Sequence, residues 1–235
     1  MGSPMPPDPA AAPGKACRLP SGLYLILDHS ALMGRSLMDV AAAAIAGGVR
    51  HIQYRAKDLS KRDAYFNSVE LRALAHRSGV TFVINDEVDL ALAVEADGVH
   101  LGQEDFPLSA ARSLLGPRRI IGVSVHTLPQ ACEAEAGGAD YLGIGPVFSS
   151  TTKQARPPLG CEALKQFRRQ VRIPIIAIGG ISMVNIRQVM AVKIAGVAVV
   201  SAVLSRSDVA AATAELTAVL NASSSIVEGQ EEGGA

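Results

Sequence analysis

Three cationic side chains in this sequence have the spacing of a site for a polyanion. Gln53, Arg55 and Lys57 occupy alternate positions of the stretch "HIQYRAKD", and strand geometry would point all three the same way. Lys153 follows a run of hydroxyl residues in "SSTTK". Two like charges about 6 Å apart repel by roughly 3 kcal/mol at an effective dielectric of about 20. Because a fold gains nothing from that repulsion, we expect these cations to hold a bound polyanion.

Two carboxylates come at similar points of the chain. Asp86 follows an apolar run in "VINDEVDLAL", and Asp105 follows the next one in "GVHLGQED". Either residue alone could be a helix N-cap or a partner in a salt bridge. Beside cations and phosphate oxygens, however, a pair of carboxylates suits Mg²⁺, which prefers hard oxygen ligands and keeps several waters. We therefore expect Asp86 and Asp105 to be metal ligands.

A second group of residues offers a neutral cradle for another anion. Glycines at 179 and 180 would let backbone N–H groups approach a phosphate closely, and a helix is expected to follow them. Ser201 adds a hydroxyl after the last apolar run, and Ser150, Thr151 and Thr152 add three more before Lys153. Glycines can also serve a tight turn, and a Ser/Thr loop can be a turn as well. Taken together, the two groups predict a site for two separate anions.

The elements that must position these residues alternate regularly along the chain. Short β-rich runs lead into loops and then into helical stretches, several of which end in glycine, as helices often do. The predicted strands are 23–28, 49–55, 80–85, 97–101, 119–125, 140–145, 173–179 and 196–201. The predicted helices between them include 36–48, 61–79, 108–116, 128–138 and 182–196.

Eight such units predict an α/β fold, a single closed (β/α)₈ or TIM barrel with parallel strands and right-handed crossovers. An open doubly wound sheet is the alternative, but no GxGxxG follows the first strand. In such barrels the chemistry lies at the carboxyl ends of the strands. The residues named above lie near the carboxyl end of a predicted strand or in the loop that follows one. We expect the barrel to span residues 21–221, with a disordered leader over 1–20 and a disordered tail over 222–235.

Composition excludes several classes of partner. The chain has 235 residues with 22 Lys plus Arg and 22 Asp plus Glu, so its formal net charge is zero. A balanced chain has no overall attraction for nucleic acid or anionic membranes, and we expect neither as a partner. Three cysteines without CxxC spacing argue against a disulfide framework or a zinc site. We expect a cytoplasmic protein, and the sequence leaves its oligomeric state open.

The ordered set of motifs resembles the thiamine phosphate synthase family from about residue 22 to 205. The stretches that carry the resemblance are "QYRAK", "INDEVDLAL", "ADGVHLGQED", "GVSVHT", "ADYLGIGPVFSSTTK", "IAIGGIS" and "GVAVVSA". Members of that family are (β/α)₈ barrels. They join a hydroxymethylpyrimidine pyrophosphate to a thiazole phosphate with Mg²⁺, which yields thiamine phosphate and pyrophosphate. The two-anion site predicted above is what this reaction needs.

The resemblance assigns roles to individual residues. It implies that Asp86 and Asp105 hold Mg²⁺ and that Arg55, Lys57, Ser124 and Lys153 are catalytic. The residues implied to bind the pyrimidine pyrophosphate are Gln53, Tyr54, Arg55, Ala56, Lys57, Asn85, Ser124 and Lys153. Those implied to bind the thiazole phosphate are Ser150, Thr151, Thr152, Gly180, Val200 and Ser201.

The chain departs from the family pattern in two places. Ala56 stands where the family usually has an acidic residue, and strand alternation turns Tyr54 and Ala56 away from the side that bears Arg55. The hydroxyl triplet begins with Ser rather than Thr. Two other activities remain open: a thiazole tautomerase on the same barrel, which would use His126 as its acid or base, and a barrel that only binds thiazole or thiamine phosphate. We leave all five histidines out of the catalytic set.

Overall fold

Each of the eight predicted strands is present, and together they close into a barrel. The computed structural model describes residues 19–149 and 157–228, so the expected leader lies almost wholly outside the described residues. The strands are β1 (Gly22–Asp28), β2 (His51–Arg55), β3 (Thr81–Asn85), β4 (Gly98–Leu101), β5 (Ile120–Val125), β6 (Tyr141–Ile144), β7 (Ile175–Ile178) and β8 (Gly196–Val199). All neighbours pair in parallel, and β1 pairs with both β2 and β8. The predicted closed barrel is confirmed, and the open sheet is excluded.

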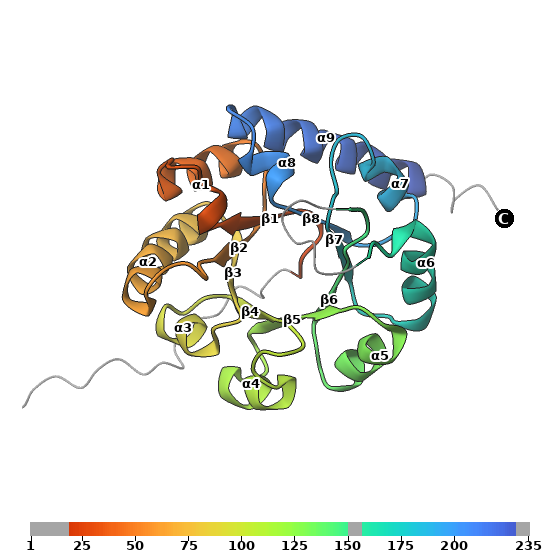
Figure 1. The fold of residues 1–235 in the computed structure, drawn as a ribbon, viewed down its shortest axis with the longest axis horizontal. Coiled ribbons are helices and arrows are strands. Elements are labelled where there is room, and N and C mark those ends of the chain that lie inside the picture. The colour runs from red at the N-terminus through yellow and green to blue at the C-terminus, as the bar shows by residue number, and fades with distance from the viewer. Residues whose placement is uncertain (1–18, 150–156, 229–235) are drawn as a thin grey trace, which may run out of the picture.

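Helices surround this barrel on the outside, as Figure 1 shows down the barrel. They are α1 (Leu37–Ala46), α2 (Lys61–Arg77), α3 (Val88–Ala93), α4 (Leu108–Leu115), α5 (Leu128–Ala136), α6 (Gly160–Gln170), α7 (Ile186–Met190), α8 (Ser201–Leu204) and α9 (Val209–Glu228), with a 3₁₀ turn η1 (His29–Ala31) after β1. None of these helices in the described part of the chain combines the length and apolarity needed to cross a membrane.

One predicted helix boundary differs from the structure, and another helix crosses the residue at which the barrel was expected to end. Helix α7 begins only at Ile186, because Asn185 ties the preceding segment into a turn by accepting from Ser182 N and donating to the Gly180 carbonyl. Helix α9 continues to Glu228, past the boundary at residue 221 that the sequence suggested. The expected tail therefore starts with helix, and residues 229–235 lie outside the described part.

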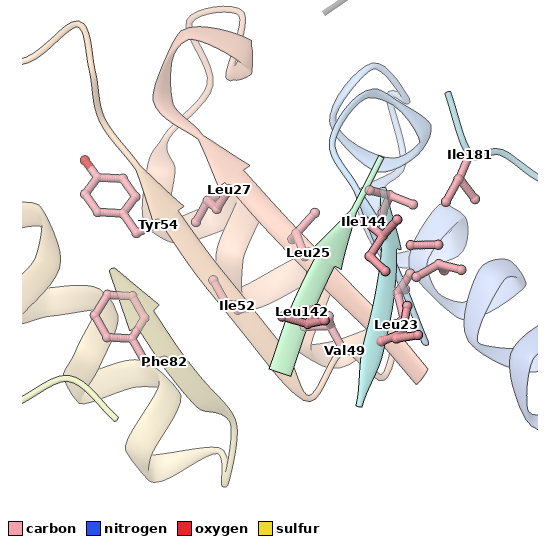
Figure 2. Packing of buried hydrophobic residues seen from close by; sticks show 14 of the residues in the cluster. Leu23, Leu25, Leu27, Val49, Ile52, Tyr54, Phe82, Leu142, Ile144 and Ile181 are labelled. Carbon is pink, nitrogen blue, oxygen red and sulfur yellow. The ribbon is translucent and has the colours of Figure 1, made fainter. Parts of the chain in front are cut away.

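Side chains alternate between the two faces of each strand, so the barrel wall lies between two packed regions. Side chains that point outward, among them Leu25, Ile52 and Tyr54, form the main core against the helices (Figure 2). Side chains that point inward, such as Tyr24 and Tyr141, form a second cluster inside the barrel. Because successive strand residues face opposite sides, one strand serves both regions. Any inward polar group must therefore find its partner on another strand.

The barrel interior is polar at one level, and glycine makes room for it. A Cβ added at Gly122 on β5 would lie 2.1 Å from the Tyr141 ring, so only glycine lets this tyrosine cross the interior. The Tyr141 hydroxyl then reaches the Tyr24 hydroxyl at 2.9 Å. The interior thus holds large aromatic groups whose hydroxyls bond one another.

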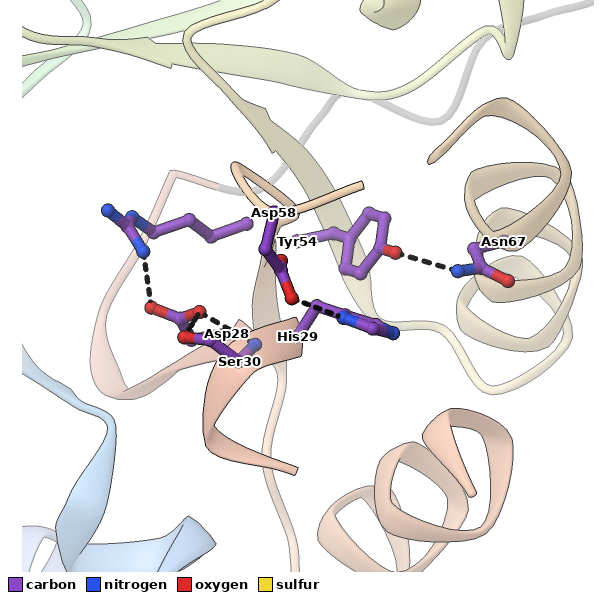
Figure 3. Close-up of polar contacts among 7 residues, drawn as sticks. Asp28, His29, Ser30, Tyr54, Asp58 and Asn67 are labelled. Atoms are coloured by element: carbon purple, nitrogen blue, oxygen red, sulfur yellow. Dashed lines mark hydrogen bonds and ion pairs between the residues drawn. The ribbon is translucent and has the colours of Figure 1, made fainter. Parts of the chain in front are cut away.

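The register predicted for β2 is confirmed. Gln53 lies inside the barrel, where its Nε2 donates to Tyr24 Oη over 3.1 Å. Tyr54 faces the opposite side and accepts a 3.0 Å hydrogen bond from Asn67 Nδ2 of α2 (Figure 3). Ala56 packs against the same outer core. Arg55, the last residue of β2, therefore continues on the side of Gln53, toward the carboxyl ends of the strands, which we call the mouth. Lys57 lies in the turn that follows β2.

The outer position of Tyr54 makes a stability prediction. Tyr54→Phe should lower the free energy of unfolding by about 1 kcal/mol, the usual value of a lost hydrogen bond. Chemical denaturation would measure this change. Tyr65→Phe is the matched control, because Tyr65 is a partly exposed tyrosine of α2. This change should alter stability by less than about 0.5 kcal/mol. Equal effects of the two changes would show that the bond to Asn67 is not formed.

Candidate active site

Arg55 reaches the mouth from the end of β2 and is held by a buried carboxylate. Its Nη1 lies 2.6 Å from Oδ2 of Asp28, the last residue of β1. Asp28 is only 3% exposed, and its other oxygen accepts from Ser30 N and Ser30 Oγ (Figure 3). The η1 turn therefore fixes the carboxylate, and the carboxylate fixes the guanidinium. Within the described part of the chain, Asp28 takes up one of the five guanidinium N–H groups.

Lys57 stands in the loop between β2 and α2, at the same mouth. Its Nζ lies 2.8 Å from Oδ2 of Asp86, which follows β3. The Lys57 side chain is about half exposed, whereas that of Asp86 is mostly buried. This ion pair joins one of the predicted pyrophosphate cations to one of the predicted metal ligands.

Asp86 and Asp105 lie side by side, as the sequence predicted. Burial raises the pKa of Asp86, and the neighbouring Asp105 raises it further, while Lys57 acts in the opposite direction. The Asp105 Oδ2 accepts from Gly102 N at 2.7 Å, so the loop after β4 orients this carboxylate. Asp86 has a backbone φ of 65°, a left-handed conformation that Asp tolerates better than most residues. Two adjacent carboxylates, of which Asp86 has a raised pKa, form a site that a cation would stabilise.

The donor set fits Mg²⁺ shared with a substrate. Among the residues that the structure describes, no group of three or more His, Cys, Asp and Glu side chains gathers as a metal site. Asp86 and Asp105 would offer two hard oxygen ligands to such an ion. Mg²⁺ in proteins is bound in this way, by one or two carboxylates and substrate phosphates.

Each described cation of the mouth has a carboxylate partner, which sequence analysis did not foresee. The expectation of cations gathered without compensation is wrong for Arg55 and Lys57, since Asp28 and Asp86 balance them. Asp28 was missed, although the alternation of Tyr24, Ile26 and Asp28 along β1 would have placed it at the mouth. These partners hold the cations in position before any ligand binds.

Ser124 and Asn85 occupy the carboxyl ends of β5 and β3, as predicted. Ser124 Oγ lies 2.9 Å from Nε2 of His100, an inward residue of β4 that pairs in register with Asn85. His100 was left out of the site by the sequence reasoning. Its inward position in "DGVHL" was the available signal. The histidine is thus a neighbour of a predicted catalytic hydroxyl.

The predicted cradle for the second anion is only partly described. Gly180 has φ of 65°, and a Cβ there would lie 2.5 Å from the Ser149 carbonyl oxygen, so the turn after β7 needs glycine. Val200 precedes α8, and the exposed Ser201 begins it. The expected helix start directly after the glycines is wrong, because α7 begins at Ile186. Ser150, Thr151, Thr152 and Lys153 lie outside the described residues.

Tyr54 faces α2, and Ala56 packs against the outer core. Their predicted role as substrate contacts stays a prediction. They line a cavity of about 540 Å³ between α2 and α3 that extends to Lys57, Asp86 and Asp105. These two residues therefore border the outer side of the site and support it.

His126 lies just beyond β5 and is anchored by the backbone. Its Nδ1 is 2.8 Å from the Gly145 carbonyl oxygen. Because a carbonyl oxygen can only accept, Nδ1 carries the hydrogen of this bond. The side chain of Gln130 accepts from His126 N at 2.9 Å. The ring is thus held against the start of the loop after β6.

Removal of Arg55 should separate its structural role from its role in binding. Arg55→Ala leaves the buried Asp28 without its cation and should cost about 3 kcal/mol of folding stability. The double variant Arg55→Ala/Asp28→Asn should regain at least about half of this loss, because no uncompensated charge remains. Chemical denaturation measures stability, and calorimetric titration measures the binding of inorganic pyrophosphate. Both variants should bind pyrophosphate weakly, and recovery of binding together with stability would contradict the role of Arg55.

The carboxylate pair predicts how Mg²⁺ affinity responds to charge and pH. Asp105→Asn should weaken Mg²⁺ binding at least roughly tenfold, since one anionic ligand is lost. In the unaltered protein, acidification should weaken Mg²⁺ binding at a higher pH than for an ordinary aspartate, because the pKa of Asp86 is raised. In Asp105→Asn, the acid-induced loss of Mg²⁺ binding should move to lower pH, because the Asp105 charge no longer raises the pKa of Asp86. Calorimetric titrations over a pH series measure both effects, with the exposed Asp89→Asn on α3 as control. An equal loss of Mg²⁺ affinity in Asp105→Asn and Asp89→Asn would exclude a metal site at Asp86 and Asp105.

Comparison with known proteins agrees with this geometry. Residues 23–203 match the family model described as thiamine monophosphate synthase. The thiamine-phosphate synthase of Chloroflexus aurantiacus is 48% identical over 200 residues, which cover 85% of this chain and 92% of that protein. The thiamine-phosphate synthase of Moorella thermoacetica is 45% identical, with coverage of 84% and 95%. The solved thiamine phosphate pyrophosphorylase from Pyrococcus furiosus superimposes with a TM-score of 0.79 at 40% identity, covering 86% of this chain and 96% of that one. The chain therefore belongs to the thiamine monophosphate synthase family.

Proposed function

We propose that this protein is a thiamine phosphate synthase. It joins 4-amino-2-methyl-5-(hydroxymethyl)pyrimidine pyrophosphate to 4-methyl-5-(2-hydroxyethyl)thiazole phosphate and releases thiamine phosphate and pyrophosphate. The observation that carries this proposal is the convergence of Arg55 and Lys57 with the adjacent carboxylates Asp86 and Asp105 at one mouth, in a chain of this family. A protein that bound only a monophosphate in the neutral cradle would have no use for these cations and carboxylates.

The pyrophosphate end of the pyrimidine substrate lies, in this proposal, against the cations. Arg55, Lys57 and Lys153 bind its oxygens, and Asp86 and Asp105 hold Mg²⁺, which neutralises charge on the departing group. Lys57 is 2.8 Å from Asp86, so its ammonium group already stands beside the metal ligands. The partner carboxylates keep the cations in position, which reduces the reorganisation that substrate binding requires.

The other ends of the substrates are bound by neutral groups. Gln53, Asn85 and Ser124 contact the pyrimidine. Asn85 and Ser124 lie at or next to the carboxyl ends of β3 and β5, and Gln53 lies one inward position deeper on β2. The thiazole phosphate takes the cradle of hydroxyls and backbone groups after β6, β7 and β8. Its members are Ser150, Thr151, Thr152, Gly180, Val200 and Ser201.

Positioning and electrostatics supply most of the rate. The C–O bond to pyrophosphate breaks early and leaves a cation at the pyrimidine methylene, which the electron-rich aminopyrimidine delocalises. The thiazole nitrogen then attacks from its bound position. Arg55, Lys57 and Lys153 stabilise charge where it develops on the leaving group. No covalent nucleophile is required of the protein. We place this activity in the cytoplasm, with small molecules as its substrates.

Pyrophosphate release tests this function directly. The protein with Mg²⁺ should release pyrophosphate only when both substrates are present, because the pyrimidine cation must be captured by the thiazole. An enzyme-coupled phosphate assay measures the release with both substrates and with either one omitted. A thiazole tautomerase or a binding protein would release none, and that result would refute the proposal.

A matched pair of lysine variants controls this assay. Lys57→Ala removes an ammonium group at the mouth and should lower turnover roughly a hundredfold, as the loss of one charge-stabilising donor does in other enzymes. Lys61→Ala removes a more exposed lysine four positions later, which pairs with Glu87 and Asp89 outside the mouth. Turnover of this variant should stay close to that of the unaltered protein. Similar losses in both would contradict the placement of the pyrophosphate.

A further inference from the structure

A chain of hydrogen bonds crosses the barrel interior and ends at the mouth. Gln53 Nε2 donates to Tyr24 Oη over 3.1 Å, and Tyr24 Oη lies 2.9 Å from Tyr141 Oη. Tyr141 Oη lies 2.8 Å from His100 Nδ1, and His100 Nε2 lies 2.9 Å from Ser124 Oγ. The five residues come from β2, β1, β6, β4 and β5, so the chain connects strands on different sides of the barrel.

The middle of this chain is buried, which limits the arrangement of its hydrogens. Tyr24 and Tyr141 are at most 1% exposed, and His100 is 9% exposed. Burial raises the pKa of Tyr24 to about 12 and that of Tyr141 well above its usual value. Both hydroxyls are therefore protonated at neutral pH, and each has one hydrogen to donate. A buried hydroxyl hydrogen without an acceptor is costly, so the hydrogens must match the contacts.

Following the hydrogens along the chain gives one consistent direction. Because Gln53 donates to Tyr24, the hydrogen of Tyr24 goes to Tyr141, and the hydrogen of Tyr141 goes to Nδ1 of His100. A nitrogen that accepts carries no hydrogen, so the neutral imidazole has its hydrogen on Nε2. His100 Nε2 therefore donates to Ser124 Oγ.

This direction determines which part of the Ser124 hydroxyl is bonded inside the barrel. Its oxygen accepts from His100, so its own hydrogen is the part that remains for a ligand. Ser124 is half-buried near the carboxyl end of β5, and no acceptor for this hydrogen lies among the described residues. Rotation about the C–O bond can direct the hydrogen into the mouth. Ser124 thus has one hydrogen that needs an acceptor on the ligand, and it leaves that hydrogen unsatisfied if the ligand offers only a donor.

We propose that His100 is a positioning residue, which acts through Ser124 to select an unprotonated ring nitrogen on the pyrimidine substrate. The interior chain from Gln53 through Tyr24 and Tyr141 fixes the tautomer of His100, and that tautomer makes Ser124 a donor. This inference rests on the proposed function, because it takes the aminopyrimidine as the ligand of the mouth.

The selection has a chemical consequence. The ring nitrogens of a 4-aminopyrimidine accept hydrogen bonds, so one of them can pair with the Ser124 hydroxyl. A 4-oxopyrimidine instead carries a hydrogen on a ring nitrogen, so the Ser124 hydrogen would lose its acceptor at that nitrogen. Sites built to hydrogen-bond one partner reject a mismatched analogue strongly. We expect kcat/KM for the amino substrate to exceed that for the oxo analogue by at least roughly a hundredfold.

The tautomer of His100 can be measured without any substrate. ¹⁵N NMR of the protein labelled at histidine distinguishes Nε2–H from Nδ1–H in a neutral ring. The His100 signals are assigned as those lost in His100→Gln. The proposal requires the Nε2–H form. A reversed chain, in which the Gln53 amide is turned over and Ser124 donates to His100, would give the Nδ1–H form and overturn it. This measurement stands even if the protein proves inactive as a synthase.

Substrate discrimination tests the positioning role itself. Tyr141→Phe removes the hydrogen that fixes the tautomer, so the preference for the amino over the oxo substrate should fall at least roughly tenfold. The KM for thiazole phosphate should stay unchanged. A residue with only a structural role would lower kcat/KM for both pyrimidines equally and leave their ratio intact, and that result would overturn the proposal.

A second tyrosine provides the matched control. Tyr65→Phe also removes a tyrosine hydroxyl, but on helix α2 outside the barrel, at a residue that was not assigned to the site. Its amino-to-oxo ratio should equal that of the unaltered protein, and an equal fall in both variants would contradict a role for the interior chain. Failure of the unaltered protein to release pyrophosphate from the amino substrate would refute the synthase function instead, and the NMR result would still decide whether Ser124 accepts from His100.

Discussion

Closure of eight parallel strands is the constraint on which the rest of this structure depends. Once β1 pairs with β8 as well as with β2, every second side chain points into an enclosed interior, and all carboxyl ends meet at one mouth. Polar groups inside must then satisfy one another across the barrel, which the chain from Gln53 to Ser124 does. The same closure brings Asp28 of β1 beside Arg55 of β2, and Asp86 after β3 beside Lys57 after β2.

Charge at the mouth is arranged in pairs before any ligand binds. Asp28 holds Arg55, and Asp86 holds Lys57, so neither cation stands uncompensated in a partly buried site. A polyanion with a divalent metal can bind here because the paired groups can still form further interactions. Within the described residues, Asp28 takes up one of the five guanidinium N–H groups, and the carboxylates Asp86 and Asp105 favour an added positive charge. The pairs thus stabilise the fold and at the same time hold the binding groups in position.

Strand positions and inward residues could be predicted from sequence because both follow from a period of two. That rule placed Gln53 and Arg55 on the inward side and turned Tyr54 outward, toward α2. It did not reveal the partners, since Asp28 meets Arg55 and His100 meets Ser124 only when strands are set side by side. Helix ends also escaped prediction where local hydrogen bonds decide them, as Asn185 does before α7. Residues 150–156 lie outside the described part, so their predicted roles stay predictions.

The central claim is that the mouth binds pyrophosphate through cations and a metal held by Asp86 and Asp105. Calorimetric titration of inorganic pyrophosphate, with and without Mg²⁺, tests it most directly. The account predicts binding that strengthens at least roughly tenfold with Mg²⁺, because the metal adds charge between the carboxylates and the phosphate oxygens. It also predicts that Asp86→Asn loses this gain. Equal affinity with and without Mg²⁺, or an undiminished gain in Asp86→Asn, would contradict the account.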